Sequence, residues 1–236
     1  MPMQFNFKQF TVVQQYSAAK ITTDATIFAA WLPILPVVQR VLEIGTGTGV
    51  MSLMVAQRSK AFIHAVEISL EAYEEARSNF KNSPYNDRLT ITHDSVQRFL
   101  DVEKFDIVFS NPPFFNNNLK SAVNALKNIA YHSDLLPFNE LAQSVDRLLK
   151  EDGQFYSMLP LYESNLFEQE MLRLGYSVSR TLAIKHNEEK KILRRIVGFS
   201  KNKKYHLKEE KLAIRNLDGT FHKDYVQLMK PFLTIF

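Results

Sequence analysis

From residue 40 onward, short apolar runs alternate along the chain with longer amphipathic segments. Runs rich in Val, Ile and Phe are typical of buried strands, and the segments between them carry apolar residues at helical spacing. This alternation predicts βαβ units and therefore a parallel sheet covered by helices on both faces. The predicted strands are residues 41–45, 62–68, 88–94, 105–110 and 153–159, and the predicted helices are residues 50–58, 70–80, 138–153 and 162–175.

The last part of the pattern differs, because two strand-like segments follow each other with only a short polar link. Residues 176–186 and 191–201 are joined by the polar residues 187–190, which predicts a hairpin. A hairpin places its second strand antiparallel to its first. We therefore expect an α/β fold of the doubly wound, Rossmann-like type, with a mostly parallel seven-stranded sheet that ends in an antiparallel strand.

A further helix is predicted before residue 40, over residues 21–33, with Thr23 or Asp24 as its N-cap and Pro33 at its end. No repeat, low-complexity tract or Gly/Ser linker interrupts the chain, so one domain is expected. Residues 114–133 form a connection too long for an ordinary turn, and such loops often bind ligands. The expected boundaries are a single domain over residues 1–236, an N-terminal appendage over residues 1–39 and a C-terminal extension over residues 201–236.

The amino-acid composition excludes several kinds of functional site. The 236 residues include no cysteine, which excludes disulfides, zinc-thiolate sites and thiol catalysis. The histidines are scattered without metal-ligand spacing, so we expect no metal site. No apolar run reaches the roughly 20 residues that span a bilayer, and the start of the chain is unlike a signal peptide. We expect a cytoplasmic protein. A net charge of +4 mildly favours a polyanionic partner.

A glycine-rich turn follows the first predicted strand of the parallel sheet. Gly45, Gly47 and Gly49 allow the backbone to turn sharply and to approach a ligand, next to the positive N-terminus of the following helix. A tight turn that binds nothing is the alternative. Val50 occupies the last glycine position of the dinucleotide-binding spacing G-x-G-x-x-G, which argues against a nicotinamide-dependent dehydrogenase.

Carboxylates end the next two predicted strands. Glu67 lies about 20 residues after the glycines, where a carboxylate can accept both hydrogens of a ribose diol. Asp94 ends the following strand and could accept the exocyclic amine of an adenine. Either residue could instead be a helix cap or a solvated acid. Taken together, the three strand ends predict a nucleoside pocket at the carboxyl edge of the sheet.

The strand at residues 105–110 ends in Asn111, followed by two prolines and two phenylalanines. Taken alone, this could be a turn. In combination with the preceding motifs, it resembles the class I S-adenosylmethionine-dependent methyltransferases, specifically the amino-methylating group with an Asn-Pro-Pro-aromatic motif. The resemblance implies S-adenosyl-L-methionine as the cofactor. It also implies that the Asn111 side-chain oxygen and the Pro112 carbonyl accept the hydrogens of a planar amine, while Phe114 stacks on its ring.

Two fixed acceptors suit this chemistry. An exocyclic amine is a poor nucleophile, because its lone pair is delocalised into the ring. Acceptors on one side can orient the nitrogen and favour the pyramidal form in which the lone pair is available. No general base is needed before attack, since the amine becomes strongly acidic only once methylated.

The resemblance extends to both ends of the chain. Residues 7–33 are similar to the N-terminal stretch of the valine-tRNA adenine-N6 methyltransferase family, and residues 212–232 resemble its C-terminal segment. The resemblance implies methylation of an adenosine in tRNA, at position 37 of a valine tRNA. Glu43 and Glu67 stand where the wider superfamily often has aspartate. The residues that the resemblance adds to the predicted cofactor site are Lys20, Thr23, Asp24, Glu43 and Asn111.

RNA docking is predicted from the motif and from the basic residues. Basic side chains are concentrated in residues 185–204, although neighbouring acids make a solvated face an equal alternative. We expect tRNA as the partner of a monomeric enzyme. The alternatives are a guanine-N2 methyltransferase of ribosomal RNA, a protein-glutamine methyltransferase, which more often has Tyr at position 114, and a cofactor-binding module without catalysis. The predicted substrate-binding residues are Pro113, Phe115, Lys120, Lys127, Arg194 and Arg195.

Overall fold

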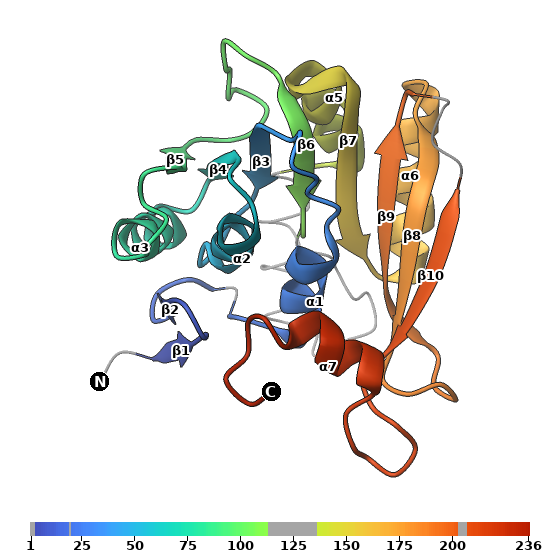
Figure 1. Ribbon diagram of the computed structural model, residues 1–236. Helices are drawn as coiled ribbons and strands as arrows, with labels where there is room; N and C mark the ends of the chain where they lie inside the picture. The colour runs from blue at the N-terminus through green and yellow to red at the C-terminus, as the bar shows by residue number, and fades with distance from the viewer. Residues whose placement is uncertain (1–2, 19, 113–135, 203–206) are drawn as a thin grey trace, which may run out of the picture.

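The computed structural model describes residues 3–18, 20–112, 136–202 and 207–236. A large twisted sheet runs through the molecule, with helices on both of its faces (Figure 1). In the order of the sheet, its strands are β10 (Lys208–Ala213), β8 (Ser177–Lys185), β9 (Ile192–Ser200), β7 (Leu149–Leu159), β6 (Phe105–Ser110), β3 (Arg40–Ile44), β4 (Phe62–Glu67) and β5 (Leu89–His93).

The strand order is that of a doubly wound sheet. From β3 in the interior the chain moves outward through β4 to β5, then returns to β6 on the other side of β3 and moves outward again through β7. These five strands are parallel, and β9 is antiparallel to both of its neighbours. The reversal between β3 and β6 creates a crevice at the carboxyl ends of the strands. The predicted fold class is confirmed.

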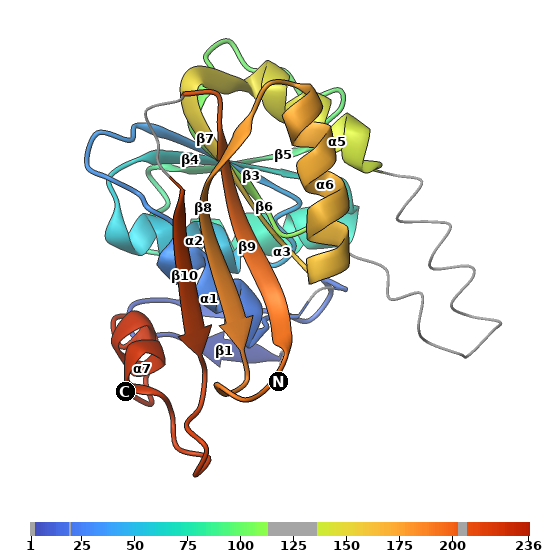
Figure 2. The same ribbon diagram turned by 90° about the vertical axis from the view of Figure 1, so that its right-hand side faces the viewer.

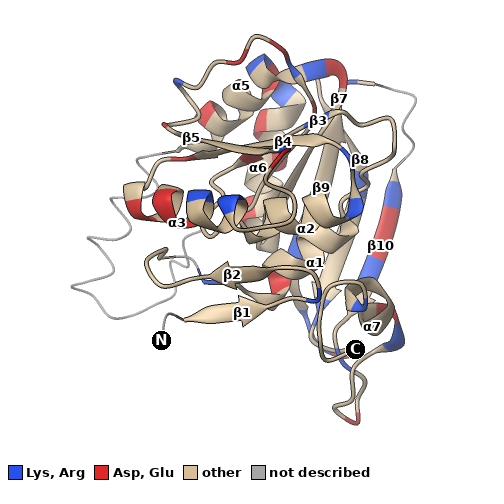
Figure 3. Ribbon diagram, turned by 60° about the vertical axis from the view of Figure 1, so that its left-hand side comes forward, with Lys and Arg blue, Asp and Glu red and all other residues tan. Residues whose placement is uncertain are grey.

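Two details of the predicted sheet are wrong. The sheet has an eighth strand, β10, which pairs in parallel with β8 at the edge, and the antiparallel β9 lies between β7 and β8 instead of ending the sheet. The sequence of β10 begins with the charged run Lys208 to Lys211, visible as alternating colours in Figure 3. Exposed edge strands commonly carry such charges, which hide the apolar pattern by which a strand is recognised.

Most of the described helices lie close to their predicted positions: α1 (Thr23–Trp31), α2 (Val50–Arg58), α3 (Leu70–Lys81), α5 (Phe138–Leu148) and α6 (Leu161–Arg173). A further helix, α7 (Lys223–Met229), was not predicted from the sequence. The N-cap of α1 is Thr22, whose hydroxyl accepts from the Ala25 amide at 3.2 Å, and not Thr23 or Asp24. The predicted helix over residues 138–153 ends early, because Leu149 is buried and pairs with Phe105 in the sheet.

Alternating residues of the inner strands build two cores. Val41 of β3 belongs to the core beneath α1 and α2, whereas Leu42 and Ile44 belong to the core beneath α5 and α6. This alternation is the expected result of a strand with both faces covered. Both faces of the central strands are therefore buried, and the carboxyl ends of the strands are where side chains can meet a ligand.

The two ends of the chain lie on the same side of the molecule (Figure 2). A hairpin of β1 (Gln4–Asn6) and β2 (Thr11–Val13) contacts the segment after α7. The Lys8 amide donates to the Phe232 carbonyl at 2.8 Å, and the Lys8 ammonium donates to the carbonyls of Lys230 and Phe236. Both terminal segments thus pack against the same part of the fold.

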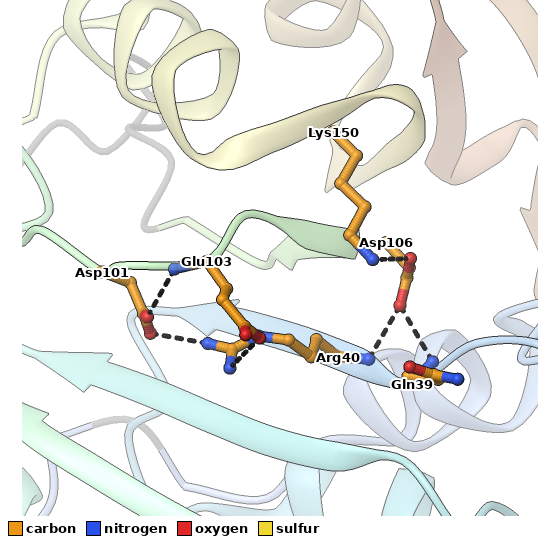
Figure 4. A network of polar contacts seen from close by, with 6 residues as sticks. All are labelled: Gln39, Arg40, Asp101, Glu103, Asp106 and Lys150. Carbon is orange, nitrogen blue, oxygen red and sulfur yellow. Dashed lines mark hydrogen bonds and ion pairs between the residues drawn. The ribbon is translucent and has the colours of Figure 1, made fainter.

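A polar network fixes the amino ends of the central strands (Figure 4). One Asp106 oxygen accepts from the backbone amides of Gln39 and Arg40, and the other contacts the Lys150 ammonium at 2.5 Å. The Arg40 guanidinium pairs with Asp101 at 2.8 Å. These contacts tie β3, β6 and β7 together at the edge opposite their carboxyl ends.

Candidate functional site

A cavity of about 580 Å³ opens at the carboxyl ends of the central parallel strands. This volume lies within the range of small-molecule sites, and the position is where doubly wound folds bind ligands. Its lining includes these residues of the predicted site: Lys20, Asp24, Glu43, Gly45, Gly47, Glu67, Asp94, Asn111, Pro112 and Arg194.

The glycine loop connects β3 to α2 along one wall of the cavity. Gly45 has a φ of 72° and open space where a Cβ would lie, so the backbone itself faces the cavity there. Gly49 is not part of the lining. Its φ is 80°, and a Cβ would lie 2.5 Å from the Phe80 ring of α3. Gly49 therefore allows α2 and α3 to pack closely and does not face the cavity.

Glu67, at the end of β4, is buried and holds the glycine loop in place. One carboxylate oxygen accepts from the Gly47 amide at 2.9 Å, and the other accepts from the Ser69 amide at 2.9 Å. Each carboxylate oxygen has two lone pairs, so both oxygens retain acceptor capacity toward the cavity. The arrangement allows Glu67 to accept both hydroxyls of a diol while it fixes the loop.

Glu43 is fully buried beneath the loop. One of its oxygens accepts from the Thr46 hydroxyl at 2.7 Å and from the amide and hydroxyl of Ser52, and its other oxygen has no hydrogen-bond partner among the described residues. Burial, assisted by the nearby Glu67 charge, raises the pKa of Glu43 to about 7, against the effect of these hydrogen bonds. Glu43 thus links both ends of the glycine loop to β3.

Asp94 follows β5 and reaches the cavity beside Glu67, since its amide donates to the Glu67 carbonyl at 3.1 Å. One of its oxygens accepts from the Ser95 amide and from the Arg98 guanidinium, and the hydrogen bonds from Arg98 lower the pKa of Asp94. Residues 96–98 form a turn, in place of the helix that Asp94 was considered to cap. The other oxygen, Oδ2, accepts no hydrogen bond from the residues that the structure describes, so it can serve as an acceptor for a ligand.

Asn111 follows β6 and borders the cavity with Pro112. The side-chain oxygen of Asn111 is buried and has no hydrogen-bond partner among the described residues. Ser110, just before it, is tied to β3 through a 2.9 Å hydrogen bond to the Ile44 carbonyl. A buried acceptor without a partner costs stability, so such a group indicates a functional role.

The N-terminal segment and β9 close the remaining side of the cavity. Asp24 of α1 and Arg194 of β9 both line it, and Arg194 Nε lies 3.3 Å from Asp24 Oδ2. Burial raises the pKa of Asp24, and Arg194 opposes this shift. The Lys20 ammonium donates to the carbonyls of Gln14 and Gln15 at 2.7 and 3.1 Å.

Three groups of predicted residues lie elsewhere. Thr23 is not part of the cavity lining, and its neighbour Thr22 is. Arg195 pairs with Glu168 of α6 at 3.0 Å and does not line the cavity, because neighbouring residues of a strand point to opposite faces. The remaining ones lie outside the described residues: Pro113, Phe114, Phe115, Lys120 and Lys127.

One residue that supports the cavity from another element was not predicted from the sequence. Glu75 of α3 accepts from the backbone amides of Gln15, Tyr16 and Ser17 at 2.5 to 3.0 Å and so fixes the segment that leads to Lys20. Nothing in the local sequence distinguishes Glu75 from the other acids of α3. Its role depends on a contact between segments about 60 residues apart.

Among the described residues, no group of His, Asp and Glu side chains could hold a metal ion. Within the same ranges, no helix is both long and apolar enough to cross a bilayer.

Comparison with solved structures places the fold. A predicted O-methyltransferase from Agrobacterium tumefaciens has a TM-score of 0.67 at 17% identity, with 89% of this chain and 96% of that chain covered. A methyltransferase from Pyrococcus furiosus has a TM-score of 0.58 at 24% identity, with 81% and 89% covered. The family described as Methyltransferase small domain matches residues 7–136. Fold and site together define the class: a methyltransferase with a doubly wound α/β sheet.

Curated relatives narrow this class. A tRNA1(Val) (adenine(37)-N6)-methyltransferase from Dyadobacter fermentans is 40% identical, with 97% of this chain and 96% of the relative covered. The protein of the same name from Cytophaga hutchinsonii is 37% identical over the same shares of both chains. This chain belongs to the tRNA1(Val) (adenine(37)-N6)-methyltransferase family.

Proposed function

We propose that this protein transfers a methyl group from S-adenosylmethionine to the exocyclic N6 amine of an adenosine in tRNA, at position 37 of a valine tRNA. The names of the curated relatives support the reaction and the substrate. The observation that carries the proposal for the site is the buried side-chain oxygen of Asn111, which has no hydrogen-bond partner in the described part of the chain and lies at the border of the cavity.

The cavity residues fit the proposed cofactor. Glu67 would accept the ribose hydroxyls with its remaining lone pairs, and Asp94 would accept the adenine amine with its second oxygen. The bound cofactor supplies an electrophilic methyl group on a sulfonium. The backbone at Gly45 would leave room for the cofactor, because Gly45 lines the cavity and nothing lies within 4 Å of the position of a Cβ there.

Asn111 and Pro112 act on the substrate amine. The Asn111 oxygen accepts one amine hydrogen, and the Pro112 carbonyl, which follows it directly, accepts the other. The fixed φ of proline holds this carbonyl in one direction. Acceptors that are already in place when the substrate arrives require no reorganisation during the reaction. The extra proton leaves to solvent after transfer, when the methylated nitrogen has become acidic.

The test offers the purified protein unmodified tRNA and ribosomal RNA with isotopically labelled S-adenosylmethionine, followed by mass spectrometry of the nucleosides. We expect labelled N6-methyladenosine in valine tRNA, at position 37 when the product is digested and mapped. Labelled N2-methylguanosine, or label found only in ribosomal RNA or in protein, would refute the proposal.

A further inference from the structure

The cavity has two chemically different ends. One end lies at β4 and β5, where Glu67 and Asp94 offer acceptors for a nucleoside. The other end is built by α1 and β9 and carries Asp24 and Arg194. Asn111 borders the same cavity. A ligand whose nucleoside lies at the first end must direct its remaining atoms toward the second.

The second end presents one positive and one negative group side by side. Arg194 Nε lies 3.3 Å from Asp24 Oδ2, and both side chains are 25% exposed, so each can also meet a ligand. The Arg194 guanidinium also donates from Nη1 to the Leu193 carbonyl at 2.8 Å, but its five N–H donors in a rigid fork can serve several acceptors. Lys20 lines this end too, but two of its three ammonium hydrogens are directed to backbone carbonyls.

The charge pattern distinguishes between two possible occupants. The amino-acid end of the proposed cofactor is a zwitterion, with an α-carboxylate and an α-ammonium on one carbon. It therefore complements an adjacent cation and anion. An RNA phosphate carries negative charge only, so it would be attracted by Arg194 and repelled by Asp24. This argues against the sequence-based prediction that Arg194 docks RNA.

We propose that Arg194 binds the α-carboxylate of the cofactor while Asp24 accepts its α-ammonium, so that a residue of the antiparallel strand β9 completes the cofactor site. The inference rests on the proposed function for the identity of the cofactor. The ion pair exists before the ligand arrives, and it keeps both groups in place for the zwitterion. Binding of the amino-acid end then depends on β9, which is distant in sequence from the glycine loop.

Three ligands distinguish the contribution of the α-carboxylate to binding from that of the α-ammonium. S-Adenosylhomocysteine carries both charged groups, 5′-S-(3-aminopropyl)thioadenosine carries only the ammonium, and 5′-methylthioadenosine carries neither. Isothermal titration calorimetry gives the affinity of each for the wild type and for the variants Arg194→Gln and Asp24→Asn. The matched control is Arg180→Gln, because Arg180 forms a similarly half-buried pair with Glu210 on the neighbouring strands and does not line the cavity.

We expect Arg194→Gln to weaken the binding of S-adenosylhomocysteine about 10- to 150-fold, which is the range for a lost charged hydrogen bond. The affinities of the other two ligands should change by less than about twofold. Asp24→Asn should weaken the binding of the two ligands that carry the ammonium and leave the affinity for 5′-methylthioadenosine unchanged. Arg180→Gln should change none of the three affinities.

Two results would overturn the inference. Equal weakening of all three ligands by Arg194→Gln would mean that Arg194 only supports the shape of the cavity. Unchanged S-adenosylhomocysteine affinity together with weaker tRNA binding would show that Arg194 binds RNA, as predicted from the sequence. Failure of the proposed function itself would look different, because the wild-type protein would then bind none of the three ligands.

Discussion

Replacing Asn111 with alanine should separate activity from stability. The substitution removes a buried oxygen that has no partner among the described residues. Such a group costs about 1–3 kcal/mol in the folded state, so its removal offsets the loss of side-chain packing. For a chain of this length, 1 kcal/mol corresponds to about 2–4 °C in Tm. We therefore expect the Tm of Asn111→Ala to equal or exceed that of the wild type by up to a few degrees.

The same substitution should nearly abolish turnover. Loss of a transition-state acceptor should lower the single-turnover rate on unmodified tRNA by at least about 100-fold, by analogy with removal of one oxyanion-hole donor. Affinity for S-adenosylhomocysteine should stay within about threefold, because the lost atom acts on the substrate amine. The measurements are thermal unfolding, quenched-flow methylation with labelled cofactor, and calorimetry.

Asn79→Ala is the matched control, since it makes the same change at a structural asparagine. Asn79 accepts from the Val13 amide at 2.9 Å and donates to the carbonyls of Val13 and Thr48 at 2.8 and 2.9 Å. Loss of these three hydrogen bonds, one buried and two partly buried, should cost about 2–4 kcal/mol and lower the Tm by roughly 4–16 °C. If Asn111→Ala behaves like this control, or keeps near wild-type turnover, then Asn111 is a structural turn residue and the mechanism is wrong.

Three further predictions concern the cofactor site and the RNA surface. Glu67→Ala should weaken S-adenosylhomocysteine about 10- to 150-fold and also lower the Tm, because it leaves two backbone amides without acceptors; unchanged affinity in calorimetry would exclude the ribose contact. Because the folded-state pKa of Glu43 is raised from 4.5 to about 7, the free energy of unfolding should fall by about 3 kcal/mol as the pH rises through this interval. In urea titrations at pH 5 and pH 8, Glu43→Gln should remove most of this pH dependence of the free energy of unfolding. An equally strong pH dependence in the variant would mean that other groups cause it. Lys190 and Lys191 are exposed near the start of β9. Replacing both with alanine should weaken tRNA binding and reduce the slope of log K against log salt concentration by roughly 0.7–0.9 per lost phosphate contact. An unchanged slope would show that the RNA binds elsewhere.

The local sequence determined the alternation of elements and the residues at the carboxyl ends of the parallel strands. Apolar periodicity marks β3, β4 and β6 because both of their faces are buried. Parallel strands end at the same edge, so Gly45, Glu67 and Asp94 could be placed together from their positions in the chain alone. These inferences succeed because each depends only on its own segment and on the direction of the strands. The prediction for Asn111 came instead from the resemblance of its Asn-Pro-Pro-aromatic motif to known methyltransferases, and Asn111 borders the same cavity.

Tertiary structure alone decided which distant segments complete the site. The place of β9 between β7 and β8 brings Arg194 to the cavity beside Asp24, and turns Arg195 toward α6. Glu75 fixes the N-terminal segment across about 60 residues of sequence, and the charged β10 becomes a strand only by pairing with β8. Such contacts leave no periodic signal, because they depend on the packing of elements against one another and not on the conformation that each segment prefers by itself.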